Sequence, residues 1–193
     1  MKKVCVFCGS SRGNNPAYLA AAQQVGELLA RRGLTLVYGG GNVGLMGAVA
    51  DAALDAGGAV IGVIPESLVR WEVAHRELTE LQVVDTMHAR KARMADLADG
   101  FLALPGGFGT LDEFCEILTW AQLGLHAKPC GLLNVAGFYD ALLAQLDRTV
   151  ADGLLRPEHR ALVLDDTDPE RLLERMRDHL GRPMPKWIDR DDR

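Results

Sequence analysis

A glycine-rich segment with a carboxylate close behind it gives the clearest signal for chemistry in this sequence. In residues 104–114, LPGGFGTLDEF, an apolar run ends in Gly106-Gly107-Phe108-Gly109, and Thr110 and Glu113 follow. Glycines let backbone N–H groups approach an anion closely, and the start of a following helix adds free N–H groups and the positive end of its dipole. The segment therefore predicts a phosphate site with a carboxylate beside it.

Thr110 and Glu113 also allow a purely structural interpretation. The pattern T-x-x-E is a capping box, in which the threonine caps a helix and the glutamate returns to the N–H of the cap. That role needs no chemistry. We predict both roles: the capping box builds the turn, and the turn presents phosphate donors and a carboxylate. The catalytic role is favoured for Glu113 because a carboxylate one turn into a phosphate-binding helix stands close to the sugar of a bound sugar phosphate.

Two more glycine-rich turns follow apolar runs, at Cys8-Gly9-Ser10-Ser11 and at Gly39-Gly40-Gly41-Asn42-Val43-Gly44. If these runs are strands of a parallel α/β sheet, all three turns lie at the carboxyl ends of strands, where such sheets bind ligands. Ser10 and Thr110 add hydroxyl donors. Three turns on one edge favour a phosphate site over three unrelated tight turns.

The second turn also fits a dinucleotide pattern, G-x-G-x-x-G, at Gly39, Gly41 and Gly44. The pattern follows the second predicted strand rather than the first, and Glu66 only loosely supplies the acidic residue expected about 20 positions on. A Walker loop is excluded, because no Lys-Ser or Lys-Thr follows the glycines. The sequence therefore favours a mononucleotide.

A cationic cluster, Met87-His88-Ala89-Arg90-Lys91, opens a predicted helix. Cations at a helix start oppose the dipole, and an anion held between Arg90, Lys91 and a glycine turn would relieve this. The alternative is an exposed basic helix face, which Arg93 continues. The five histidines are dispersed without metal-ligand spacing, so no metal is predicted.

Alternating strand and helix patterns must position these residues. Strands are predicted at 3–9, 34–41, 59–64, 81–85, 101–107, 128–135 and 161–166, and helices at 17–33, 45–58, 87–100, 110–124, 138–153 and 168–181. The strands are apolar on both faces, which is typical of a parallel sheet covered by helices on both sides. We predict a doubly wound α/β fold in one domain, residues 1–181, with a tail at 182–193 and an irregular segment at 66–79.

Composition narrows the classes of function. The 193 residues carry a net charge of -5 and no polybasic stretch, so no nucleic-acid partner is predicted. No segment approaches the ~18 apolar residues of a membrane span, and the N-terminus reads as a strand rather than a signal peptide. A cytoplasmic protein is expected. Cys5 and Cys8 have redox spacing, but residues three apart in a strand face opposite sides, so packed, reduced thiols are predicted.

Four segments of the sequence together resemble the LOG family. Its members are the cytokinin riboside 5′-monophosphate phosphoribohydrolases, which were long mislabelled as lysine decarboxylases. Residues 105–113 match its P-G-G-x-G-T-x-x-E motif, 39–47 resemble its G-G-G-x-x-G-L-M-G loop, and 87–91 resemble M-H-x-R-K. Residues 119–124, TWAQLG, also look like the family. The resemblance runs from about residue 3 to 155.

The resemblance implies a Rossmann-like fold, usually a homodimer, without a cofactor. It implies hydrolysis of the N-glycosidic bond of a nucleoside 5′-monophosphate to a free base and ribose 5-phosphate. The family's catalytic residues correspond here to Arg90 and Glu113. Its substrate contacts correspond to Glu72, Arg90, Lys91, Gly107, Phe108, Gly109, Thr110, Leu111, Asp112, Glu113 and Thr119. The other two glycine turns add phosphate contacts at Gly9, Ser10, Gly40, Gly41, Gly44 and Met46.

The chemistry suits these residues. Departure of the base builds positive charge on the ribose, which Glu113 can stabilise, or Glu113 can accept a proton from the attacking water. A guanidinium holds its proton too tightly for a general acid, so Arg90 is assigned to orienting the ribose or phosphate and stabilising the departing base.

Two other functions stay open. One is a nucleotide-binding module without catalysis, against which the pairing of Glu113 with Arg90 argues. The other is a lysine decarboxylase, which needs a lysine in a pyridoxal phosphate setting. The base, adenine or an N6-isoprenoid adenine, is also open. Candidates for an apolar base pocket are Phe108, Met94, Trp71 and Trp120.

Overall fold

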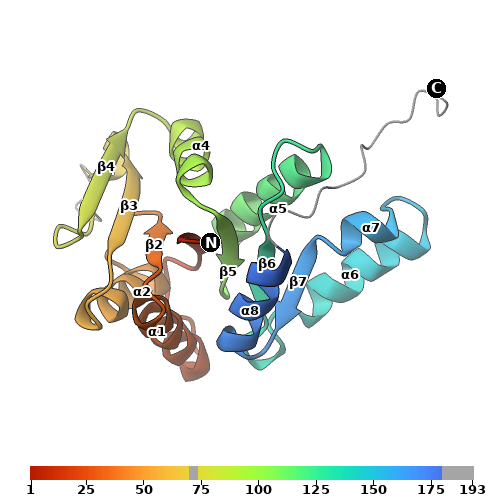
Figure 1. The fold of residues 1–193 in the computed structure, drawn as a ribbon, viewed down its shortest axis with the longest axis horizontal. Helices are drawn as coiled ribbons and strands as arrows, with labels where there is room; N and C mark the ends of the chain where they lie inside the picture. Colours follow the sequence, from red (N-terminus) through yellow and green to blue (C-terminus); the bar gives the residue numbers. More distant parts are fainter. Residues whose placement is uncertain (70–73, 180–193) are drawn as a thin grey trace.

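Seven parallel strands form one twisted sheet in the computed structural model, which describes residues 1–69 and 74–179. The strand order is β4-β3-β2-β1-β5-β6-β7, so β4 and β7 form the edges (Figure 1). The strands are β1 (Lys3–Phe7), β2 (Thr35–Tyr38), β3 (Val60–Pro65), β4 (Glu80–Val84), β5 (Gly100–Ala103), β6 (Cys130–Leu133) and β7 (Val163–Asp166). The predicted Rossmann-like doubly wound α/β fold is confirmed.

Helices cover both faces of this sheet. They are α1 (Pro16–Arg31), α2 (Gly44–Asp55), α3 (Glu66–Val69), α4 (Met87–Leu97), α5 (Phe108–Gln122), η1 (Val135–Gly137), α6 (Asp140–Ala151), α7 (Pro157–Arg160) and α8 (Pro169–His179). Buried residues of α1, α2 and α8 pack in one core cluster, and those of α4 and α5 pack in another, which α6 also flanks. Successive strand residues alternate between the two clusters, as a strand buried on both faces requires.

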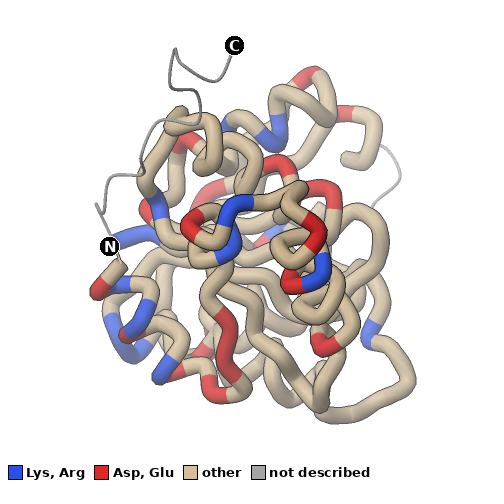
Figure 2. The backbone as a smooth tube through the Cα atoms, turned by 90° about the vertical axis from the view of Figure 1, so that its right-hand side faces the viewer, with Lys and Arg blue, Asp and Glu red and all other residues tan. Residues whose placement is uncertain are grey.

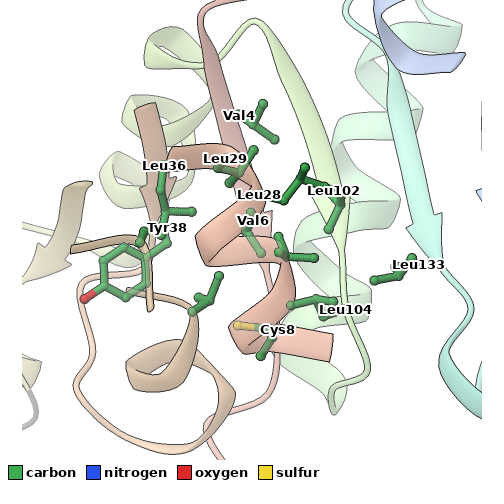
Figure 3. Close-up of a cluster of buried hydrophobic side chains, with 14 of the residues drawn as sticks. Val4, Val6, Cys8, Leu28, Leu29, Leu36, Tyr38, Leu102, Leu104 and Leu133 are labelled. Carbon is green, nitrogen blue, oxygen red and sulfur yellow. The ribbon is translucent and has the colours of Figure 1, made fainter. Parts of the chain in front are cut away.

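Strand β1 shows this alternation clearly. Val4, Val6 and Cys8 face the cluster of α1 and α2, where Leu28 and Leu29 of α1 meet them (Figure 3). Cys5 belongs to the opposite cluster. The predicted separation of Cys5 from Cys8 is therefore confirmed, and all four cysteines of the chain are free.

Predicted and observed elements differ mainly at their ends. The helix predicted at 17–33 ends at Arg31, and Gly33 follows with a φ of +65°, a left-handed conformation that glycine tolerates. Short elements α3, η1 and α7 have too few residues to show a periodic pattern. The predicted tail at 182–193 and the last two residues of the helix predicted at 168–181 lie outside the described residues.

The topology creates one switch point. Strand β1 lies between β2 and β5, and the connections leave β1 and β5 toward opposite faces of the sheet. In doubly wound sheets the crevice at this point, beyond the carboxyl ends of the strands, is where ligands bind.

Lys and Arg positions are interspersed with Asp and Glu positions on the side shown in Figure 2. No helix in the described ranges is long and apolar enough to cross a membrane.

Candidate active site at the switch point

The three glycine-rich turns meet at this switch point. The N–H of Gly9, after β1, donates to Pro105 O at 3.1 Å, and Gly9 O accepts from the N–H of Leu45 at 3.0 Å. At Gly44 a side chain is impossible, because φ is +63° and a Cβ would lie 2.2 Å from the backbone of Ser10. The turn after β1 is thus bonded to both of the others, as their predicted shared edge required.

The start of α5 is open toward solvent. Gly107 is the N-cap and no side chain caps the helix, so the first N–H groups have no intrahelical partner. A Cβ on Gly107 or Gly109 would meet no atom within 4 Å. Phe108 between them is 91% exposed. This end of α5 can therefore present N–H groups and its positive dipole end to an anion.

The predicted capping box is wrong. Helix α5 begins at Phe108 rather than Thr110, because Gly107 takes the extended N-cap conformation without needing a side-chain cap. Thr110 is already inside the first turn and buried. Glu113 Oε1 accepts from Arg90. The helix-capping role of Glu113 therefore does not hold.

Arg90 and Glu113 form a buried ion pair. Arg90 Nη1 donates to Glu113 Oε1 at 2.9 Å, and the two residues are 8% and 9% exposed. Arg90 Nε donates to Val63 O at 3.1 Å and Nη2 donates to Gly39 O at 3.3 Å. Strand β3, the second glycine turn and α5 therefore hold the guanidinium in one orientation. Thr86 caps α4 by accepting the N–H of Ala89 at 3.0 Å, which fixes the helix that carries Arg90.

Burial and the charge of Arg90 act on the pKa of Glu113 in opposite directions. Burial raises the pKa of Glu113 above the ordinary glutamate value, and the guanidinium of Arg90 offsets only part of that rise. A carboxylate with a raised pKa is a better proton acceptor than an ordinary glutamate. Raised pKa values of this kind gather at functional sites.

Lys91 contacts carboxylates of α5. Its Nζ lies 3.1 Å from Asp112 Oδ2 and 3.1 Å from Glu116 Oε2. Arg90 and Lys91 each have carboxylate partners on α5, so a bound anion is not required to balance them. The alternative of an exposed basic face does not describe these two side chains, which are 10% and 13% exposed.

Other predicted site residues lie at varied distances from the pair. Met46 is half-buried against the core cluster of α1 and α2. Thr119 is exposed further along α5, where its hydroxyl donates to Cys115 O at 2.8 Å, and it faces α6 and α7 rather than the glycine turns. Glu72 and Trp71 lie outside the described residues. Of the other base-pocket candidates, Met94 is buried in the core and Trp120 packs against it half-buried.

Sequence reasoning missed two residues near the pair. Met87 Sδ lies 3.6 Å from Arg90 Nη1, and the residue is 47% exposed. His75 is buried against the second glycine turn. Met87 was part of a recognised motif but had no assigned role, and nothing in the pattern of the irregular segment marked His75.

Known proteins are similar to this chain in sequence or in fold. Residues 46–176 match the family described as "Possible lysine decarboxylase". The chain is 51% identical over 179 residues to the probable cytokinin riboside 5′-monophosphate phosphoribohydrolase LOGL9 of Oryza sativa subsp. japonica, covering 93% of this chain and 79% of that protein. It is 46% identical over 181 residues to the cytokinin riboside 5′-monophosphate phosphoribohydrolase LOG1 of Arabidopsis thaliana, covering 94% and 85%.

Solved structures agree on the fold. The molybdenum cofactor binding protein of Rippkaea orientalis superposes with a TM-score of 0.69 at 26% identity, covering 92% of this chain and 97% of that one. The molybdenum cofactor carrier protein of Chlamydomonas reinhardtii gives 0.69 at 21% identity, covering 94% and 99%. The family match and the relatives close to half identical decide the assignment: the chain belongs to the family described as possible lysine decarboxylases, which includes the LOG phosphoribohydrolases.

Proposed function

We propose that this protein hydrolyses the N-glycosidic bond of an adenosine 5′-monophosphate, with or without an N6 substituent, to the free base and ribose 5-phosphate. The observation that carries the proposal is the buried Arg90–Glu113 pair beside the uncapped start of α5. Relatives at 46% and 51% identity, named as phosphoribohydrolases for cytokinin riboside 5′-monophosphates, support the same reaction.

Phosphate binding is assigned to the glycine turns. The free N–H groups at the start of α5 and the hydroxyl of Ser10 are the donors. The contacts we propose for the phosphate and ribose are Gly9, Ser10, Gly40, Gly41, Gly44 and Gly107 to Asp112, with Met46 supporting the second turn. Binding the phosphate away from the reacting bond fixes the ribose against Glu113, which lowers the barrier by orientation.

Bond cleavage is assigned to Glu113 and Arg90. The bond from ribose C1′ to the base nitrogen breaks, and its electron pair leaves with the base, which takes up one proton. The water oxygen bonds to C1′ and its proton passes to Glu113. Glu113 Oε1 is held by Arg90, so we assign Oε2 to the water and to the positive charge that develops on the ribose. Arg90 orients Glu113 and stabilises the departing base.

A non-catalytic binding module is the second candidate. It is favoured by the similarity in fold to proteins named for binding or carrying the molybdenum cofactor. Lysine decarboxylation has less support, because Lys91 is held by two carboxylates and Lys128 Nζ donates to Ala95 O at 2.7 Å. Both amines are thus engaged by other groups of the protein.

We further propose a cytoplasmic homodimer that takes no nucleic-acid partner. The four free thiols suit a reducing compartment. Exposed apolar side chains at Phe108, Leu123 and Leu125 offer surface that a second copy could cover. Light scattering of the purified protein measures the mass, and a monomer at micromolar concentration would refute the dimer. The substrate contacts that the resemblance implies for Thr119 and Glu72 stay predictions; Thr119 lies away from the proposed phosphate site, and Glu72 lies outside the described residues.

One chromatographic experiment tests the reaction. The protein is incubated with AMP and, separately, with N6-isopentenyl-AMP, and free base and ribose 5-phosphate are quantified. Equal amounts of both products from either substrate support the hydrolase, and the ratio of kcat/KM values gives the preference for the base. Binding of both nucleotides by calorimetry without product formation would establish the binding module instead.

A further inference from the structure

The segment that begins at Ala74 lies across the second glycine turn. The N–H of His75 donates to Gly40 O at 2.9 Å, and Ala74 forms an isolated antiparallel bridge with Gly41. The segment therefore contacts the turn through its backbone. His75 is 7% exposed, although it lies in a stretch without extended regular structure.

The imidazole of His75 ties the same segment to α2. Its Nε2 lies 2.9 Å from Asp51 Oδ1, and its Nδ1 lies 3.3 Å from the N–H of Glu77. Because Nδ1 accepts that N–H, it carries no proton, and the ring proton sits on Nε2, where it is donated to Asp51. One side chain thus joins its own segment to α2, the helix that begins at the end of the turn.

The second glycine turn, which His75 contacts, also accepts a hydrogen bond from Arg90. Gly39 O accepts from Arg90 Nη2, and the next carbonyl, Gly40 O, accepts from the backbone N–H of His75, the residue whose imidazole is anchored to α2. A Cβ on Gly39 would lie 1.8 Å from Arg90 Nη2, so the backbone of the turn lies directly against the guanidinium. Movement of the turn must therefore change the position of Arg90.

We propose that His75 is a positioning residue that fixes the Gly39–Gly44 turn and, through Gly39 O, aims Arg90 at Glu113. His75 acts through Arg90 and does not touch the reacting atoms. The kinetic consequence rests on the proposed function, whereas the effect on Arg90 does not. The competing role is purely structural, a tie between a surface segment and α2 that supports folding alone.

Conservative variants separate the two nitrogens of the ring. Gln at position 75 can still donate to Asp51, and Asn can still accept from the N–H of Glu77. His75→Ala loses both bonds, and Asp51→Asn weakens the first. If the link to α2 positions the turn, activity follows the order wild type, His75→Gln, His75→Asn, His75→Ala.

His126 provides a matched control. Its Nδ1 also accepts the N–H two residues on, from Lys128 at 3.1 Å, and its Nε2 lies 3.0 Å from Ile117 O. It makes the same kind of local tie, but near the far end of α5. His126→Ala reports the cost of losing such a tie without disturbing the second glycine turn.

The kinetic test measures kcat and KM for base release in these variants. We expect His75→Ala to lower kcat on the order of 10- to 100-fold, as small misplacements of catalytic groups do, with KM within about threefold. His75→Gln recovers most of the loss, and His126→Ala leaves kcat unchanged. Equal kcat values in His75→Ala and wild type, or the same loss in His126→Ala, would overturn the proposal.

An NMR readout is independent of turnover. The Nε–H resonance of Arg90, which reports its bond to Val63 O, is assigned with Arg90→Lys. It should shift or broaden in His75→Ala and stay in place in His126→Ala. An unmoved resonance refutes the positioning role even in an active enzyme. A moved resonance in a protein that releases no base keeps the positioning role and refutes the proposed hydrolase.

Discussion

Replacing Glu113 by Gln separates the chemistry of this residue from its packing. The two side chains have nearly the same shape, so the substitution removes the charge and leaves an amide oxygen that can accept from Arg90 Nη1. Glu113 is 9% exposed and lies 2.9 Å from Arg90. The change therefore acts on the ion pair with little change in volume.

Two opposing effects set the loss of stability. Removing one partner of a buried ion pair costs about 3–5 kcal/mol when the remaining charge is left without a partner. Here burial outweighs Arg90 in setting the pKa of Glu113, so the buried charge is itself costly and its removal offsets part of the loss. The remaining cost is the difference between a charge-assisted and a neutral hydrogen bond, about 1–2 kcal/mol in the free energy of unfolding. At this chain length that lowers Tm by about 2–4 °C per kcal/mol.

Activity should fall far more than stability. Loss of a general base lowers kcat by about 10²- to 10⁴-fold. The assay compares base release from N6-isopentenyl-AMP with thermal unfolding of the same preparation. Glu116→Gln is the control, because it removes a charge one turn away that contacts Lys91 rather than Arg90. A folded Glu113→Gln protein that keeps more than a tenth of wild-type kcat would refute the assignment of Glu113.

Three further predictions follow from the same geometry. Gly39→Ala places a methyl group 1.8 Å from Arg90 Nη2, so kcat should fall on the order of 100-fold while the protein stays folded by circular dichroism; unchanged kcat would contradict the contact. The raised pKa of Glu113 means that the folded state binds this proton more tightly than the unfolded chain. As the pH increases from the ordinary glutamate pKa to above the raised pKa of Glu113, the residue loses its proton in the folded state. Over that interval kcat/KM should therefore rise, and the contribution of Glu113 to the free energy of unfolding should fall. The rise in kcat/KM should be absent in Glu113→Gln. Tyr38 Oη is buried without a hydrogen-bond partner among the described residues, whereas Tyr139 Oη donates to a backbone carbonyl at 2.6 Å. Tyr38→Phe should be at least as stable as wild type, and Tyr139→Phe should lose about 1–3 kcal/mol in chemical denaturation.

The inner strands and the long helices could be predicted because burial on both faces leaves continuous apolar runs in a strand, and surface helices leave periodic ones. The meeting of the three glycine turns at the carboxyl edge followed from parallel topology, and the binding of a ligand there stays a prediction. The helix start at Phe108 could not be predicted in this way. Thr110 and Glu113 satisfy a local capping rule, and only the extended conformation of Gly107 and the nearby guanidinium show that the rule is not used.

The sequence by itself determined the fold class and the shared edge of the glycine turns and, through resemblance, led to the proposal of catalytic roles for Arg90 and Glu113. These features depend on local patterns, which can be recognised in the sequence alone. The tertiary structure alone decided that Arg90 contacts Glu113, that Lys91 contacts Asp112 and Glu116, and that His75 holds the second glycine turn. Each of these contacts joins residues from different elements of the fold. Their partners depend on how the helices pack across the sheet, which no local pattern encodes.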